Sequence, residues 1–226
     1  MPDLYKLKQN LIISNNDTPV PPAYLQDGSR YRMAGTFNSI TQARLATGVW
    51  THAFNSGSPS FIEFAAADSR QCNFTSEDFT VALWALSGSF GAAMYFIGQG
   101  VTDTDGWGFF IFMNTLSFRL NQAAGHTDIS AVDAFRFGRW QLIGVTRAGN
   151  TGQFYVNGAP VTTIGGGGLV DAVSCNGGNK VLIGINDNEA TNAWDGSLVG
   201  YGIIEKSLSA GEMAKMFENE RRYFGV

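Results

Sequence analysis

The sequence predicts an all-β fold in which two antiparallel sheets pack face to face and one short helix lies near the C-terminus. Charged residues make up only 15% of the 226 residues, whereas 28 glycines and 17 phenylalanines supply turns and bulky apolar side chains. This composition is typical of strands joined by turns, and not of helical or disordered chains. Since β sandwiches of roughly 200–250 residues often form one domain, the length predicts a single large domain.

Several segments have the patterns of individual strands. Residues 79–86, 108–113 and 140–145 are almost continuously apolar, which predicts strands near the middle of a sandwich. Residues 116–121 alternate apolar and polar side chains, so this strand is expected to have one polar face. The side chains predicted to be buried are Val81, Leu83, Phe109, Ile111, Leu142, Val145, Phe154 and Ile183.

A hairpin and a helix have local signals. Asn157-Gly158 stands between two β-prone runs and supplies the two positive-φ residues of a type I′ turn. Pro160 lacks a backbone donor, which predicts an edge position or a bulge for the strand that follows. Ser209 and Glu212 have the spacing of a capping box, so a helix should begin at Ser209.

Residues 1–35 differ from the rest and are interpreted as an extended arm that precedes a domain of residues 36–226. The stretch 15–22 is polar and then rich in proline, which excludes a central strand. Two interpretations stay open: the arm packs on its own domain, or it reaches a neighbouring subunit. The side chains able to anchor it are Leu4, Tyr5, Leu7, Leu11, Ile12 and Ile13.

Four motifs follow one another in the order of a known family. They are Asp78-Phe-Thr-Val-Ala-Leu-Trp84, Gly106-Trp-Gly-Phe109, the hairpin segments 138–147 and 154–158, and an ending that runs from Leu182-Ile-Gly184 to Glu212. In this order they resemble laminin-G-like and pentraxin-type modules of the concanavalin A-like lectin/glucanase superfamily. The resemblance covers roughly residues 48–225 and implies a two-sheet jelly-roll sandwich. It leaves the function open, because the fold carries lectins, glycosidases, adhesion modules and virion proteins.

The residues predict no catalytic centre. Glycosidases of this fold pair two carboxylates on one strand, but the E-x-D-x-x-E pattern is absent, Glu63 stands alone, and the adjacent Glu77 and Asp78 would point to opposite faces. The only histidines, His52 and His126, accompany no G-x-S-x-G motif. The chain is therefore interpreted as a non-catalytic module, with a glycoside hydrolase as the weakest alternative.

Calcium is the one cofactor that the sequence leaves possible. Family members often bind it at a loop rim, and a hard cation needs several oxygen ligands. The loop carboxylates that could supply them are Asp103, Asp105, Asp187 and Glu189. Turns rich in Asp and Asn also arise for backbone reasons alone.

Loop aromatic residues are the candidates for ligand contact. Trp107 and Trp194 are flanked by turn-type residues, with Asn192 and Asp195 beside Trp194, so their rings could stack on sugars. Packing inside the domain is the alternative for both. Cys72 and Cys175 lie far apart in the sequence and are expected to be free thiols, although a bridge between them stays open.

The predicted partners are other protein subunits, glycans or both. A net charge of −4 without basic runs excludes a nucleic-acid partner, and the sequence contains no apolar run long enough to cross a membrane. Because of the arm and the lack of a visible signal peptide, we expect a structural, decoration or adhesion protein of an assembly such as a phage virion. A stand-alone lectin-like module is the alternative. The expected location is a virion or extracellular surface, otherwise the cytoplasm.

Overall fold

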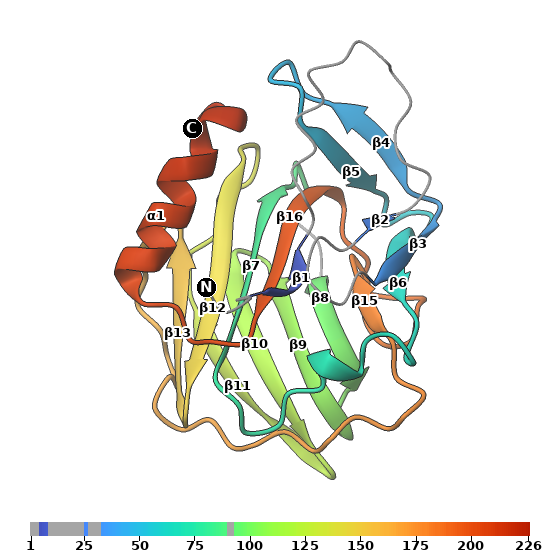
Figure 1. Ribbon diagram of the computed structural model, residues 1–226, viewed down its shortest axis with the longest axis vertical. Coiled ribbons are helices and arrows are strands. Elements are labelled where there is room, and N and C mark those ends of the chain that lie inside the picture. The colour runs from blue at the N-terminus through green and yellow to red at the C-terminus, as the bar shows by residue number, and fades with distance from the viewer. Residues whose placement is uncertain (1–4, 9–24, 27–32, 90–92) are drawn as a thin grey trace.

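A computed structural model describes residues 5–8, 25–26, 33–89 and 93–226. These residues form two eight-stranded sheets, and every strand pairing within them is antiparallel. One α-helix, α1 (Ala210–Glu220), and two short 3-10 helices, Arg70–Cys72 and Arg221–Tyr223, complete the described elements. The predicted two-sheet jelly-roll sandwich with a C-terminal helix is therefore confirmed (Figure 1).

The first sheet has β7 and β16 at its centre, and β1 (Tyr5–Lys8) pairs with β16 outside the main strand order. The main order is β14 (Ala159–Pro160), β13 (Thr151–Val156), β12 (Gln141–Ala148), β7 (Phe79–Leu86), β16 (Gly196–Ile204), β5 (Trp50–Phe54) and β4 (Thr41–Arg44). Asn157 and Gly158 both have positive φ angles of 51° and 77°, so the predicted hairpin turn is confirmed. Strand β14, which contains Pro160, lies at the edge as expected, where no further strand needs the missing donor.

The second sheet contains the longest run of neighbouring hairpins, from β8 to β11. Its order is β11 (Gly125–Ala131), β10 (Thr115–Gln122), β9 (Asp105–Phe112), β8 (Ala93–Val101), β15 (Val181–Ile183), β6 (Phe61–Phe64), β3 (Ala34–Asn38) and β2 (Leu25–Gln26). In β10, Leu116, Phe118 and Leu120 are fully buried, and Ser117, Arg119 and Asn121 take the other face, as the alternation predicted.

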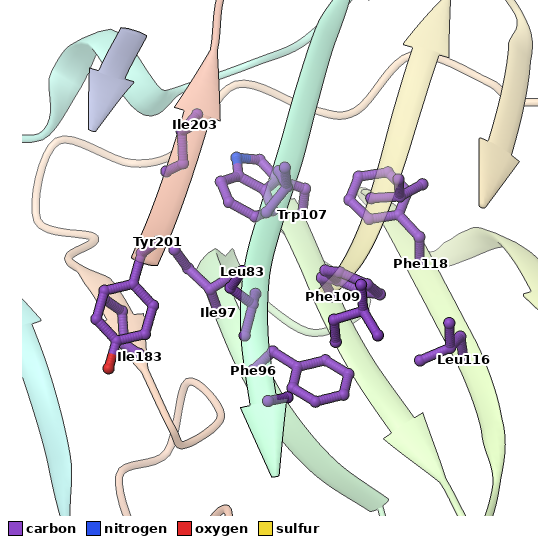
Figure 2. Packing of buried hydrophobic residues seen from close by; sticks show 14 of the residues in the cluster. Leu83, Phe96, Ile97, Trp107, Phe109, Leu116, Phe118, Ile183, Tyr201 and Ile203 are labelled. Carbon is purple, nitrogen blue, oxygen red and sulfur yellow. The ribbon is translucent and has the colours of Figure 1, made fainter. Parts of the chain in front are cut away.

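The main hydrophobic core fills the space between the two sheets. Figure 2 shows side chains of β7 and β16 meeting those of β8, β9, β10 and β15, with Phe109 among them. All eight residues predicted to be buried are buried. Leu142 differs from the other seven because it belongs to a separate cluster beneath the helix.

Helix α1 covers the outer face of the first sheet. Ser209 caps it and forms the predicted capping box with Glu212, and Figure 1 shows the helix alongside β12 and β13. Met213 packs against Tyr155 and the buried Ala82. The chain after the helix continues this cover, because Phe224 stacks on Trp84 with ring centroids 4.0 Å apart.

The segment 108–113 is less completely buried than the sequence predicted. Its continuous apolar character predicted a strand within the core, and Phe109 and Ile111 are indeed fully buried. Phe112 and Met113, however, are 50% and 56% exposed. Side chains alternate along the strand, so Phe112 points to the outer face of the sheet, and Met113 follows in the turn between β9 and β10.

Two short pieces of the predicted arm belong to the sheets. In β1, Tyr5 pairs with Ile204 and Lys8 with Gly202 of the same chain, and β2 pairs with β3. Of the proposed anchors, Tyr5 and Leu7 fall in β1, whereas Leu4, Leu11, Ile12 and Ile13 lie outside the described residues. Strand β3 begins at Ala34, two residues before the predicted start of the domain.

Candidate functional site

A groove of about 630 Å³ lies on the outer face of the second sheet. Strands β8, β9, β10 and β11 form its floor, and the loop after β15 forms one wall. Because side chains alternate along a strand, the burial of Phe109 and Ile111 between the sheets places Phe110 and Phe112 on this outer face. The groove is therefore built from the polar and aromatic side chains that the core does not use.

Three aromatic side chains give the groove an apolar floor. Tyr95 and Phe110 stack with ring centroids 4.9 Å apart and planes inclined by 15°. Gly108 makes this arrangement possible, because a Cβ there would lie 2.8 Å from Cε1 of Tyr95. Tyr95 and Phe110 are only 8% and 7% exposed, so Phe112 is the aromatic residue of the floor that a ligand can reach.

An arginine and an aspartate stand beside the aromatic floor. Nε and Nη2 of Arg119 donate to the two carboxylate oxygens of Asp128, each at 2.8 Å. The guanidinium carbon also lies 5.3 Å from the Phe110 ring centroid, within the range of a cation–π contact. The hydrogen bond to Asp128 raises the pKa of Arg119 above its ordinary value, so the guanidinium stays charged.

This ion pair continues into a small network at the end of the sheet. Nδ1 of His126 hydrogen bonds with Oδ1 of Asp103, and its Nε2 lies 3.6 Å from Oδ2 of Asp128. The hydrogen bond to His126 is the main reason that the pKa of the Asp103 carboxyl lies below its usual value. The network joins the β8–β9 turn to β11 and thereby fixes the position of Asp128.

The loop after β15 supplies the polar wall of the groove. The Tyr95 backbone N–H donates to the Asn192 carbonyl at 3.0 Å, and Oδ2 of Asp187 accepts from the Thr102 N–H at 3.2 Å. These bonds attach the loop to β8 and to the turn after it. The amide and hydroxyl side chains that line the groove are Thr102, Ser117, Asn186, Asn188, Thr191 and Asn192.

Asn186 has an incomplete set of hydrogen bonds. It is 7% exposed and lines both the groove and an adjoining hollow of about 20 Å³. Its Nδ2 donates to Oγ1 of Thr191 at 3.2 Å, but among the described residues no partner donates to its buried Oδ1. A buried acceptor of this kind is commonly satisfied by ordered water, and the hollow has room for about one water molecule.

The aromatic candidates from the sequence require correction. Trp107 and Trp194 are fully buried members of the core, and Nε1 of Trp107 donates to the Cys72 carbonyl at 2.8 Å. Neither ring offers a face to a sugar. Asp195 accepts from Oγ of Ser89 at 2.7 Å and does not line the groove, whereas Asn192 does.

The four carboxylates considered for calcium do not converge. Within the described part of the chain, no three His, Cys, Asp or Glu side chains are grouped so that they could hold a metal ion. Asp103 bonds with His126, and Asp105 accepts from the Val101 and Asn176 backbone N–H groups. Asp187 holds Thr102, and Glu189 pairs with Lys180 at 3.0 Å. The four carboxylates therefore do not form one ion site: Asp105 and Asp187 both hold the turn between β8 and β9, in which Asp103 lies, and Glu189 pairs elsewhere. Calcium binding itself stays a prediction.

The other titratable residues named from the sequence have structural contacts. Glu63 pairs with Lys180 at 3.0 Å, and Oδ1 of Asp78 accepts from the Gly149 N–H at 2.7 Å. Burial lowers the pKa of His52 to about 4. Cys72 and Cys175 form no disulfide with each other, and burial raises the pKa of the Cys175 thiol to about 12, which leaves that thiol protonated and unreactive.

Sequence reasoning missed the residues that form the groove floor. The alternation in 116–121 indicated a polar face that includes Arg119, but it did not show that Asp128 lies opposite in the next strand. The apolar run 108–113 concealed the outward direction of Phe110 and Phe112. Periodicity of two, applied within that run once Phe109 is placed in the core, would have identified both.

A known protein family matches most of the chain. Residues 61–214, most of the 226-residue chain, match the family model described as "Concanavalin A-like lectin/glucanases superfamily". The chain belongs to this superfamily. The resemblance recognised from the motifs is thus confirmed. No curated protein matches the sequence.

Solved structures with the same fold include binding domains of bacterial toxins. The botulinum neurotoxin serotype G binding domain has a TM-score of 0.68 at 14% identity, over 87% of this chain and 48% of that one. The binding domain of Paraclostridial Mosquitocidal Protein 1 has a TM-score of 0.68 at 16% identity, over 99% and 55%. A botulinum neurotoxin type C structure, described as dependent for cell entry on two ganglioside molecules, has a TM-score of 0.67 at 17% identity, over 96% and 51%. The chain spans about half the length of these structures, and at such identities they establish the fold alone.

None of the described helices is long and apolar enough to cross a membrane.

Proposed function

We propose that this chain is a glycan-binding module and that the groove on the second sheet is its binding site. The observation that carries the proposal is the exposed ring of Phe112 beside a wall of amide, hydroxyl and carboxylate side chains. Sugars present an apolar ring face and a rim of hydroxyl groups. A site with an aromatic platform and convergent polar groups complements both surfaces.

The hydrogen-bonding groups of the groove fit hydroxyl ligands. Asn186 has a buried acceptor oxygen to which no described residue donates, and a sugar hydroxyl or a water molecule that bridges to it can supply a donor. The superfamily is described by its lectins and glucanases. This description supports a glycan as the ligand class for this chain.

The proposed role is non-catalytic. Two of the described residues that line the groove are carboxylates, and both already bond to protein groups: Asp128 pairs with Arg119, and Asp187 accepts from Thr102. A glycosidase needs one carboxyl group that donates a proton and a second that attacks or activates water. Incubation with the glycans that bind, followed by analysis of reducing ends, should reveal no hydrolysis.

The test of binding compares two neighbouring exposed residues. We expect Phe112→Ala to weaken binding of the best glycan on an array by about tenfold, because truncation removes the stacking surface. Met113→Ala is the matched control, since Met113 is 56% exposed but does not line the groove. Titration calorimetry gives both affinities, and thermal melting shows whether each variant folds.

Equal affinities for Phe112→Ala and the unsubstituted chain would place the binding site elsewhere. Failure to bind any glycan on a broad array would overturn the proposed function itself.

The sequence also led us to expect a subunit of an assembly such as a phage virion. That expectation depended on the N-terminal arm reaching a neighbouring subunit. Residues Tyr5–Lys8 of that arm pair with β16 of the same chain. This contact favours the interpretation in which the arm packs on its own domain. The assembly role stays a prediction. Deletion of residues 1–28, with light scattering and calorimetry, tests it: loss of assembly would support the role, and a lower melting temperature alone would contradict it.

A further inference from the structure

We propose that the groove selects neutral glycans and rejects glycans that carry a carboxylate or sulfate group. This inference rests on the proposed function and adds the chemical class of the ligand. It follows from the charges of the described residues that line the groove and from the bonds of Arg119, the one cation among them.

Negative charge predominates around the groove. Among its described lining residues, Arg119 is the one cation, whereas Asp128 and Asp187 are carboxylates. One positive charge against two negative charges leaves a formal charge of −1 beside the ligand. An anionic sugar placed there meets net repulsion, and a neutral sugar meets hydrogen-bond acceptors for its hydroxyl groups.

The charge of Arg119 is already paired with a carboxylate of the protein. Its Nε and Nη2 both donate to Asp128 at 2.8 Å, which is the paired arrangement that an arginine would use for a ligand carboxylate. Its guanidinium also lies over the Phe110 ring. A ligand carboxylate that took this edge of the guanidinium would have to displace Asp128, and any ligand carboxylate nearby would meet a cation whose charge is already balanced.

The neighbouring cation is occupied as well. Lys180 lines the hollow next to the groove, and its Nζ lies 3.0 Å from carboxylate oxygens of both Glu63 and Glu189. These hydrogen bonds raise its pKa above the ordinary value of a lysine. The hollow therefore offers no unpaired positive charge, at least among the residues that the structure describes.

The first experiment measures discrimination by the unsubstituted chain. A glycan array that contains matched pairs, such as lactose with sialyllactose, compares each neutral glycan with its acidic derivative. We expect the neutral member to bind at least about fivefold more tightly wherever binding occurs, the size of a single charge repulsion across a few ångströms of water. The difference should shrink as salt rises from about 0.01 to 0.5 M, because ions screen exposed charges.

The second experiment removes the group that occupies Arg119. In Asp128→Asn the amide cannot neutralise the guanidinium, so the acidic member of each pair should gain at least about fivefold in relative affinity. Glu218→Gln is the matched control, because Glu218 pairs with Arg221 at 2.8 Å on helix α1, which covers the other sheet. This control should leave discrimination unchanged.

The outcomes separate the two proposals. Tighter binding of acidic members by the unsubstituted chain, or no shift toward them in a folded Asp128→Asn variant, would overturn neutral selectivity and leave glycan binding intact. If Asp128→Asn does not fold, discrimination by the unsubstituted chain still decides the question. Absence of binding to every member would overturn the proposed function together with this inference.

Discussion

The outer faces of the two sheets differ in what lies upon them. On the first sheet, Trp84, Leu142 and Val199 form an apolar surface that is buried beneath α1 and the chain that follows it. On the second sheet, Tyr95, Phe110 and Phe112 share the face with Ser117, Arg119 and Asp128, and a groove lies over them. Figure 1 shows α1 on the first of these faces.

The composition of each outer face explains why the face of the first sheet is covered and the face of the second sheet is accessible. An apolar outer face must be covered, because burial stabilises by roughly 25 cal/mol per Å² of apolar surface. A face with an arginine–aspartate pair gains less from cover, since desolvation of the two charges opposes it. The sheet that contains the ion pair is therefore the one whose outer face carries the open groove.

The largest effect expected from this comparison is a loss of stability on the first sheet. Trp84 is fully buried, stacks on Phe224, and donates from Nε1 to Glu220 at 2.7 Å. Trp84→Ala should lower the free energy of unfolding by about 3–5 kcal/mol, measured in guanidinium. The matched change on the second sheet, Phe112→Ala, should alter stability by about 0.5 kcal/mol or less. Similar losses for both variants would show that the two faces do not differ as described.

A somewhat smaller effect concerns pH and the interior between the sheets. His52 contacts Phe37 of the second sheet and Tyr201 of the first, and burial lowers its pKa from 6.5 to about 4. The unfolded chain binds a proton below about pH 6.5, but the folded chain does not. Stability is therefore complete above pH 6.5 and should fall as the pH drops toward 4, by roughly 3 kcal/mol in total.

Denaturation at pH 7 and pH 5 isolates this contribution. Glu212, whose pKa is lowered to about 2 chiefly by its hydrogen bond with Lys206, adds stability that is lost only below about pH 4.5. In His52→Asn the difference between pH 7 and pH 5 should largely disappear, while the amide nitrogen, which takes the place of Nδ1, can still donate to the Tyr201 hydroxyl. An unchanged difference in this variant would assign the pH dependence to another group.

The smallest effect concerns the attachment of the helical cover. Ser209→Ala removes the side chain that accepts from the Glu212 N–H, so the free energy of unfolding should fall by about 1 kcal/mol. Glycan affinity should stay constant because α1 lies on the sheet without the groove. Calorimetric unfolding and glycan titration on one sample test both statements. A loss of affinity would indicate coupling between the two outer faces.

Local features of the fold could be predicted from the sequence because their signals are short-range. The Asn157-Gly158 turn requires positive φ angles at adjacent residues, and the spacing of Ser209 and Glu212 is that of one helical turn. Continuous apolar runs identified β7 and β12 as central strands. The order of the motifs then identified the superfamily. Each of these signals depends on residues that are neighbours in the chain.

The tertiary structure alone decided where the site lies. Trp107 and Trp194 have the same turn-type neighbours as surface aromatic residues, yet the sandwich closes over both. The groove brings β8 to β11 together with residues 186–192, which are far away in the sequence. Its key pair, Arg119 and Asp128, meets only because β10 and β11 pair in a register that sets them opposite each other. Strand register and sheet order are long-range properties, so side-chain patterns within one strand cannot determine them.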